Sequence, residues 1–248
     1  MKTIPYSDIL NQTHTLIAGT TGSGKSVLIN GLMCELLNIK PDCKLVLIDL
    51  KKVELSEYKN IKQTFSYSDS SISAVNALKS VINIINIRYN YMQHNHIKTF
   101  CKEPVYVIID ELADLMTVNK KDILPLLQRI GQIGRAANVH MICATQCPLV
   151  TVIPTSLKVN FTAIIGLKTR SKQDSRNILG VTGCEELPQY GYGYYLRPSH
   201  DIELFSIPYI QETDISAIVK PLKKSFTERY MVLTIAVCIL LKVLITVL

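Results

Sequence analysis

Residues 13–26 read THTLIAGTTGSGKS, and this stretch decides the fold. The apolar run 13–18 has the length of a short buried strand, and residues 25–37 carry leucines at helical spacing. Between the two, residues 19–26 (GTTGSGKS) fit the pattern Gly-x-x-x-x-Gly-Lys-Ser/Thr. A strand, a glycine-rich turn and a helix in this order are typical of a loop that holds phosphate groups. We therefore predict a nucleotide-binding loop at this turn.

Each residue type in this loop has a physical role in holding a triphosphate. Glycines permit backbone angles that turn several N–H groups toward one phosphate, and the following helix presents the positive end of its dipole. Lys25 is expected to contact the β- and γ-phosphates, and Ser26 to ligate Mg²⁺, so ATP and Mg²⁺ are the expected cofactors. The predicted nucleotide-binding residues are Gly19, Thr20, Thr21, Gly22, Ser23, Gly24, Lys25, Ser26 and Val27.

The rest of the chain alternates strand-like and helix-like segments. This alternation predicts an α/β fold, here a P-loop NTPase, with a central and mostly parallel sheet that ends in a C-terminal antiparallel pair. Strands are predicted at 13–18, 44–49, 105–110, 139–145 and 162–167, helices at 25–37, 71–94, 122–136 and 172–179, and the antiparallel pair at 191–196 and 202–207.

An acid pair follows the strand expected over residues 105–110. Asp110 closes this strand and is placed to hold Mg²⁺ through water, and Glu111 can polarise the attacking water as a general base. The alternative is that both residues merely open the next helix, since acidic side chains favour a helix N-terminus. The glycine-rich loop favours the hydrolytic interpretation, with Lys25 and Glu111 catalytic and Asp110 and Ser26 at the metal.

A polar residue also follows the strand expected over residues 139–145. The side-chain amide of Gln146 can sense a γ-phosphate through a hydrogen bond, so Gln146 joins the predicted catalytic set.

These segments together resemble the FtsK/SpoIIIE family of DNA translocases. The matching pieces are LIAGTTGSGKSVLIN, LIDLKKVELSEY, VIIDELADLM, IGRAANVHMICATQ and SKQDSRNILG, all between His14 and Ile207. The resemblance implies a RecA-like sheet, a homo-oligomer, most simply a hexameric ring, and double-stranded DNA as the partner that ATP turnover moves.

A ring implies that each nucleotide lies between two subunits, where a neighbour's arginine can neutralise the transferring phosphate. The candidates are Arg176 and Arg135, and Arg170 and Lys172 are expected to assist. Arg176 is preferred, because it lies far along the chain from the subunit's own nucleotide-binding segments.

The sequence departs from the family pattern after two of the expected strands. Leu50 stands where the family usually has proline, and Cys147 stands where an arginine usually follows the Ala-Thr-Gln triplet. Lys51 and Glu54 are expected to couple nucleotide state to neighbouring subunits without being catalytic. The residues after Ile210 are too few for a winged-helix module that reads DNA polarity, so any choice of direction is expected to come from elsewhere.

Composition agrees with an anionic partner. The 248 residues carry a formal net charge of +7, and phosphate contacts from lysine and arginine bind DNA without reading its sequence. The 7 cysteines show no Cys-x-x-Cys pair and are expected to be reduced thiols of a cytoplasmic protein. Candidate DNA contacts are Lys120, Lys121, Lys158, Arg170 and Lys172.

The C-terminal end differs in composition from the rest. Residues 1–220 are expected to form the motor domain, 221–230 a basic linker, and 231–248 an apolar segment that is a candidate membrane anchor. Eighteen residues can just span a bilayer, although Lys242 within this segment opposes insertion. The expected location is therefore the cytoplasm, with tethering to the inner face of the cell membrane as an option.

Two other functions remain open at this point. One is an FtsK-like ATPase of a protein secretion or conjugative transfer system. The other is a membrane-tethered module that binds nucleotide for assembly. The apolar tail favours these alternatives, whereas the intact set of Lys25, Ser26, Asp110 and Glu111 opposes a module without hydrolysis.

Overall fold

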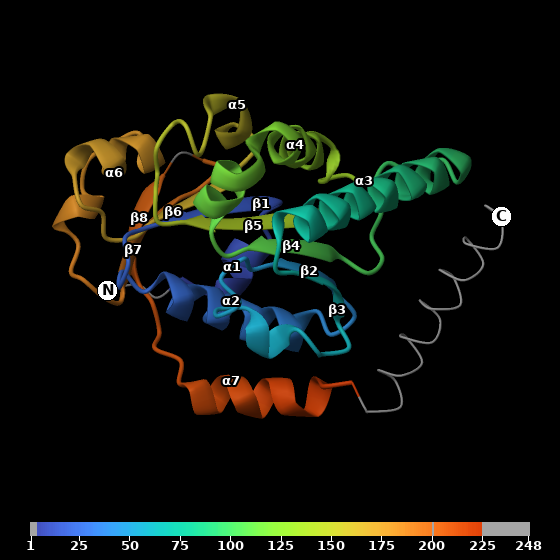
Figure 1. Ribbon diagram of the computed structural model, residues 1–248, viewed down its shortest axis with the longest axis horizontal. Helices are drawn as coiled ribbons and strands as arrows, with labels where there is room; N and C mark the ends of the chain where they lie inside the picture. The colour runs from blue at the N-terminus through green and yellow to red at the C-terminus, as the bar shows by residue number, and fades with distance from the viewer. Residues whose placement is uncertain (1–3, 200, 225–248) are drawn as a thin grey trace.

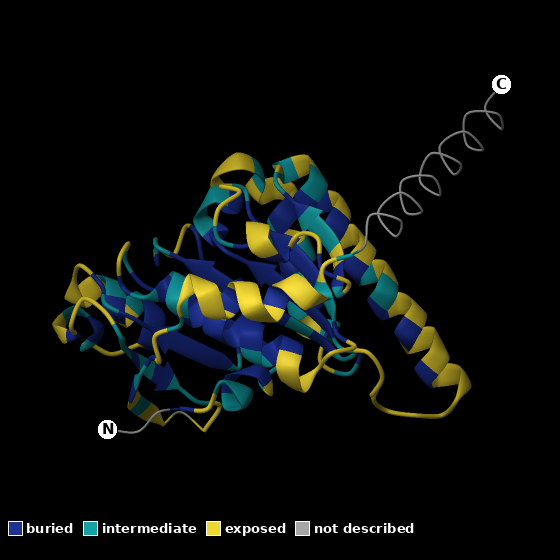
Figure 2. Ribbon diagram, turned by 90° about the horizontal axis from the view of Figure 1, so that it is seen from below, coloured by how far each residue is buried: buried dark blue, intermediate teal, exposed yellow. Residues whose placement is uncertain are grey.

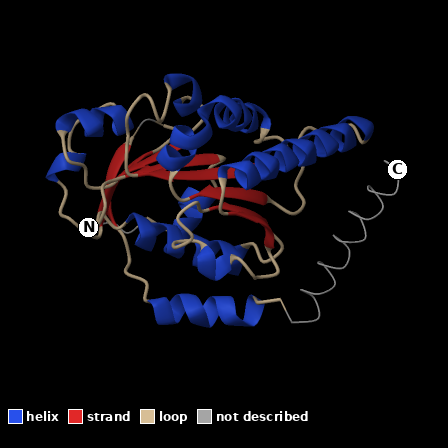
Figure 3. Cartoon of the chain, in the orientation of Figure 1, coloured by secondary structure: helices blue, strands red, loops and turns tan. Residues whose placement is uncertain are grey.

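One sheet with helices on both faces forms the framework (Figures 1 and 3). The computed structural model describes residues 4–199 and 201–224. The strand order is β3-β2-β4-β5-β1-β6-β7-β8, in which the first six are parallel and the last two antiparallel. The strands are β1 (His14–Ala18), β2 (Lys44–Ile48), β3 (Thr64–Ser68), β4 (Val105–Ile109), β5 (Val139–Thr145), β6 (Ala163–Gly166), β7 (Tyr192–Leu196) and β8 (Ile202–Ser206). The predicted fold class, including the C-terminal antiparallel pair, is confirmed.

Helices cover the sheet in two layers. In Figure 1, α3, α4, α5 and α6 lie above the sheet, and α2 and α7 lie below it. The helices are α1 (Tyr6–Leu10), α2 (Lys25–Ile39), α3 (Ser71–His94), α4 (Leu112–Ile133), α5 (Thr155–Lys158), α6 (Lys172–Leu179) and α7 (Glu212–Val219), with short 3₁₀ turns at Ser56–Tyr58, Cys184–Glu186 and Lys220–Leu222.

Alternating side chains of the strands supply two separate cores. In β1, Leu16 packs into the core that contains Leu78 of α3, whereas Ile17 packs into the core that contains Leu28 of α2. This is the period-two alternation of a strand covered on both faces, which is why the central strands read as continuous apolar runs. Figure 2 shows the result, with mostly buried strands and exposed outer faces on the surrounding helices.

The helix predicted over residues 122–136 differs from the observed one. Helix α4 begins ten residues earlier, at Leu112, and ends at Ile133. Its backbone leaves helical geometry at Asn119 (φ −152°, ψ 56°), so the element consists of two helical pieces joined at a kink. The prediction captured the second piece. The first was missed because the polar run around Asn119 interrupts the apolar pattern.

Strand β3 and helices α1, α5 and α7 were not predicted. Strand β3 reads TFSYS and carries too few aliphatic side chains to show as a buried strand, although it pairs with β2. Helix α7 packs Ile215 and Val219 into the lower core beneath α2.

The first residues of the expected linker lie against the domain. Lys223 forms an isolated antiparallel bridge with Ile61, and the backbone N–H of Lys224 donates to the carbonyl of Asn60 at 2.9 Å. The remainder of the linker and the candidate anchor, residues 231–248, lie outside the described residues. Within the described part of the chain, none of the helices combines the length and the apolar character needed to cross a bilayer.

Candidate nucleotide-binding site

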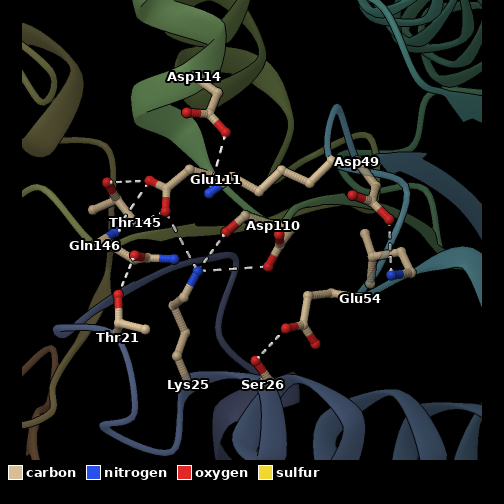
Figure 4. A network of polar contacts seen from close by, with 12 residues as sticks. Thr21, Lys25, Ser26, Asp49, Glu54, Asp110, Glu111, Asp114, Thr145 and Gln146 are labelled. Carbon is tan, nitrogen blue, oxygen red and sulfur yellow. Dashed lines mark hydrogen bonds and ion pairs between the residues drawn. The ribbon is translucent and has the colours of Figure 1, made fainter.

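The predicted site residues other than the candidate arginines meet at one edge of the sheet, because their strands are parallel neighbours. β5 lies between β1 and β4, and β2 lies on the other side of β4. The carboxyl ends of all four strands therefore open toward the same edge. Figure 4 shows side chains from the loops after these strands converging on Lys25.

The glycine-rich loop connects β1 to α2. Gly22 and Gly24 have φ angles of 76° and 93°, in the region that glycine adopts without a steric cost. A Cβ on Gly19 would lie 2.6 Å from the Leu167 side chain, so the loop packs tightly against β6. Helix α2 begins at Lys25, and the first N–H groups of a helix lack partners within it. The loop thus presents backbone donors at the positive end of α2, as a phosphate site requires.

The remaining predicted loop residues take different places. Thr20 donates from its hydroxyl and its backbone N–H to the carbonyl of Lys168, which fixes the start of the loop. Ser23 is buried, and its hydroxyl makes no hydrogen bond within the described residues. Val27 packs its side chain against the lower core, so only its backbone faces the site.

Lys25 points directly at the acid pair. Its Nζ donates to the backbone carbonyl of Asp110 at 3.0 Å and lies 3.5 Å from Asp110 Oδ1 and 3.6 Å from Glu111 Oε2. The lysine is only 7% exposed, and both carboxylates are also buried. A buried cation held by two carboxylates has little mobility, so the positive charge is in place before a phosphate arrives.

Asp110 offers an unused oxygen. Burial raises the pKa of its carboxyl, against the opposing effect of Lys25, and Glu54, Asp49 and Glu111 raise it further. Within the described residues its Oδ1 accepts no hydrogen bond, although it lies near Lys25. A divalent cation would satisfy this oxygen and relieve the crowding of negative charge. The Asp110 carboxylate is therefore compatible with an Mg²⁺ ion, and metal binding by Asp110 and Ser26 stays a prediction.

Glu111 is held by donors from two elements. Its Oε1 accepts from the Thr145 hydroxyl at 2.7 Å and from the backbone N–H of Ala113 at 3.3 Å, and both carboxylate oxygens lie 3.1 Å from the N–H of Gln146. Glu111 is thus also the N-cap of α4. The helix-opening part of the alternative therefore holds for Glu111, whose carboxylate caps α4 and also lies 3.6 Å from Lys25 Nζ, and its catalytic role stays a prediction.

Gln146 connects the end of β5 to the glycine-rich loop. Its side-chain oxygen accepts a hydrogen bond from the Thr21 hydroxyl at 2.7 Å. A residue expected to sense the γ-phosphate therefore contacts the loop that would hold it.

The structure adds one residue whose contact the sequence did not predict. The Ser26 hydroxyl donates to Glu54 Oε1 at 2.6 Å, so Glu54 reaches the site, whereas Lys51 pairs at 3.4 Å with Asp114 on α4. The available signal was the position of Glu54 in the loop after β2, since β2 was predicted to be another strand of the parallel sheet.

The two candidate arginines lie at opposite edges of the sheet, and both are exposed. Arg176 belongs to α6, which follows β6, the neighbour of β1. A cavity of about 320 Å³ joins Gly19 and Thr20 to Arg170 in the loop that precedes this helix. Although α6 is far from the glycine-rich loop along the chain, it therefore lies close to that loop in space. Arg135 instead precedes β5, at the edge opposite the glycine-rich loop.

Together, the loop between β1 and α2, the acid pair after β4 and the polar residue after β5 define a P-loop NTPase. A sequence model of the FtsK/SpoIIIE family matches residues 1–103 and 101–150. The chain belongs to the FtsK/SpoIIIE family.

Curated relatives with similar sequences carry one name. The chain is 35% identical to a DNA translocase FtsK of Rickettsia bellii over 90% of its own length, and 35% identical to one of Rhizobium meliloti over 91%. It covers 36% and 31% of those two proteins, so it spans about a third of their length.

Solved structures share the fold. The cytoplasmic domain of the Type VII secretion ATPase EccC of Thermomonospora curvata matches with a TM-score of 0.74 at 23% identity, over 87% of this chain and 28% of that one. The pCW3 conjugation coupling protein TcpA, solved with ATPγS, matches with a TM-score of 0.74 at 24% identity, over 86% of this chain and 66% of that one.

Proposed function

We propose that this chain is the motor part of an ATP-driven translocase that moves double-stranded DNA. The observation that carries the proposal is the contact of Lys25 with both Asp110 and Glu111 at the end of a glycine-rich loop. Membership of the FtsK/SpoIIIE family, and the name of the relatives, support DNA as the polymer.

The residues divide the work of hydrolysis. Lys25 and the backbone donors at the start of α2 hold the β- and γ-phosphates, and Glu111 orients and deprotonates the attacking water. Ser26 and Asp110 would hold Mg²⁺, which would supply neutralisation of the phosphate charge. Gln146 reports the state of the γ-phosphate to β5 and, through Thr21, to the loop. ATP binding and turnover by these groups are the chemical step of the motor.

Lysines and arginines on the upper helices are proposed to contact the DNA backbone. Lys121, Arg170 and Lys172 are exposed. The Lys120 ammonium donates to the carbonyl of Thr151 at 2.8 Å. Lys158 donates to the carbonyl of Asn177 at 2.8 Å, and burial lowers its pKa, so it must leave this contact to meet a phosphate.

A ring of identical subunits, most simply six, would place a neighbour's arginine at each nucleotide. Arg135 and Arg176 are the proposed candidates. We infer that Arg135 is the first candidate, because it precedes β5 at the sheet edge opposite the subunit's own phosphate loop. Arg176 is then available for the DNA or for the subunit's own site.

A second function is supported by the solved structures. A secretion ATPase and a conjugation coupling protein share the fold, so a role in protein secretion or conjugative transfer is the alternative proposal. The membrane-tethered option depends on residues 231–248. A variant truncated near Lys224 lacks this segment, so its ATPase activity can be measured without any membrane attachment.

The experiment that tests the proposal is ATPase activity with and without duplex DNA across a range of salt. We expect DNA to raise the rate at low salt and the stimulation to fall steeply as salt rises, because phosphate contacts release counterions. Lys25→Ala should abolish both rates. Persistent turnover that ignores DNA at low salt would favour the secretion alternative, and no turnover under any condition would end the motor proposal.

A further inference from the structure

Glu54 occupies a place beside the expected metal ligand. Its Oε1 accepts a hydrogen bond from the Ser26 hydroxyl, with 2.6 Å between the two oxygens. The side chain is half-buried between the loop after β2 and the start of α2. Its charge also reaches Asp110, where it contributes to the raised pKa of that carboxyl. Glu54 therefore lies close to both residues proposed to hold Mg²⁺ (Figure 4).

The hydrogen bond is compatible with metal binding by Ser26. A serine hydroxyl has one proton and two lone pairs, and the bond to Glu54 uses the proton alone. Both lone pairs stay free, and the rotation of the O–H group is fixed. A hydroxyl held in this way is prepared for a cation, as ligands in metal sites are oriented by the partners behind them.

The loop that carries Glu54 is itself anchored. Asp49 accepts hydrogen bonds from the backbone N–H groups of Lys52 at 2.9 Å and Leu55 at 3.0 Å, and from the Tyr67 hydroxyl at 3.3 Å. Leu55, the residue after Glu54, is fully buried in the lower core. The fold thus fixes the backbone on both sides of the carboxylate.

We propose that Glu54 is a positioning residue for the magnesium ion: it holds the Ser26 hydroxyl with its lone pairs free for the metal and adds a negative charge to the site. This inference rests on the proposed ATPase function. It differs from the expectation that Glu54 signals to a neighbouring subunit, because the contact lies within one chain.

The test is the Mg²⁺ dependence of nucleotide binding. Binding of a fluorescent ATP analogue is measured against Mg²⁺ concentration for the wild type, Glu54→Gln and Glu54→Ala. Loss of such a partner typically costs about 10–100-fold in metal affinity, so Glu54→Ala should need that much more Mg²⁺ for half-maximal binding. Glu54→Gln keeps an oxygen that can accept the hydrogen bond but loses the charge. Its Mg²⁺ concentration for half-maximal binding should lie between those of the wild type and Glu54→Ala.

Two comparisons separate positioning from a structural role. Binding in EDTA should be unchanged or tighter in both variants, because a negative charge near the triphosphate has been removed. Glu57→Gln is the matched control, since Glu57 lies three residues further along, is exposed and pairs with Lys223 at 3.5 Å. Its Mg²⁺ midpoint should equal that of the wild type.

A wild-type Mg²⁺ midpoint in Glu54→Ala would overturn the inference. So would an equal loss of binding with and without Mg²⁺ accompanied by a lower melting temperature, which would mean that Glu54 only supports the loop. If the wild type itself bound no nucleotide under either condition, the proposed function would fail, and the role of Glu54 with it.

Discussion

The Glu111 carboxylate caps a helix and is also the proposed general base. Its carboxylate caps α4 through the N–H of Ala113, accepts from Thr145 and Gln146, and faces Lys25. Removing the charge and removing the acceptor are therefore different changes, and they can be separated by choosing the substitution.

Glu111→Gln should bind ATP and Mg²⁺ as the wild type does but hydrolyse at least about 100-fold more slowly, because a general base contributes about 10²–10⁴ in rate. The amide oxygen can still cap α4, so stability should change little. Glu111→Ala should lose the same activity and also about 1 kcal/mol of stability through the missing cap. Single-turnover hydrolysis and urea unfolding measure the two effects, and normal turnover in the Gln variant would show that Glu111 is not the base.

His14 makes stability depend on pH. It lies buried in β1, and burial together with the nearby His140 lowers its pKa to about 4, against an opposing effect of the Gly131 backbone. The neutral ring is thus favoured in the folded state. The resulting stability is full above about pH 6.5 and is lost as pH falls toward the folded-state pKa.

For His14 we expect about 2 kcal/mol of unfolding free energy to disappear between pH 7.5 and pH 5. His14→Leu should lose less stability over this range, because it removes the titrating ring. His94→Gln is the control, since His94 is exposed at the end of α3. Urea unfolding midpoints at the two pH values measure this difference. Equal pH dependence in the His14→Leu variant and the wild type would show that His14 is not the titrating group.

At the scale of elements, α3 is fastened to the sheet by one buried arginine. The Arg88 guanidinium donates to the carbonyls of Ala137 at 2.7 Å, Asn138 at 3.1 Å and Glu103 at 2.6 Å, and it stacks over the Phe100 ring at 4.4 Å. These carbonyls belong to the segments that lead into β4 and β5, so the arginine joins the upper helical layer to two central strands.

Arg88→Met should therefore lower the unfolding free energy by about 3 kcal/mol, since it leaves partly buried carbonyls without their charged donor. The methionine keeps most of the apolar stem, which limits the loss of packing. Lys79→Met on the exposed face of the same helix is the control and should change stability by less than about 0.5 kcal/mol. Comparable losses in the two variants would mean that the hydrogen bonds contribute little.

Elements also explain which parts of the site could be predicted. Lys25, Asp110, Glu111 and Gln146 each follow a strand directly, or open the next helix, and parallel neighbouring strands bring such residues together without further information. Glu54 lies six residues beyond the end of β2, in an irregular loop. Its direction depends on the hydrogen bonds of Asp49, one of which comes from β3.

The elements that escaped prediction lack a strong apolar period. β3 is recognised only through its pairing with β2, and the first piece of α4 is separated from the second by the kink at Asn119. The preference for Arg176 stays a prediction, but its argument from chain distance is weakened, since β6 returns the chain to the side of β1. The number of residues between two segments does not predict their distance in space until the strand order is known.

At the scale of the whole molecule, the proposed ring can be tested by mixing inactive subunits. Arg135→Ala and Lys25→Ala should each lower ATPase activity by about 10³-fold or more. If Arg135 acts on the neighbour's nucleotide, a mixture should regain activity, because about a quarter of randomly formed interfaces in a cyclic oligomer contain both intact parts. The same mixture made with Arg176→Ala tests the other candidate.

The control for this mixing is the double variant Lys25→Ala with Arg135→Ala, which should not rescue the Lys25→Ala subunit. Recovery with Arg176→Ala and none with Arg135→Ala would reverse the assignment. No recovery with either arginine would place the catalytic cation elsewhere or rule out shared sites.

The strand β5 has a consequence for timing in such an assembly. One end carries Gln146, which contacts the phosphate loop through Thr21, and the other end follows the turn that holds Arg135. Backbone hydrogen bonds from Asn138 to Arg135 and from Val139 to Gly134 tie that turn to the strand. Seven extended residues span about 23 Å. In the proposed ring, β5 would therefore connect the γ-phosphate contact of one site to the arginine proposed for the next, and turnover at neighbouring sites would be coupled.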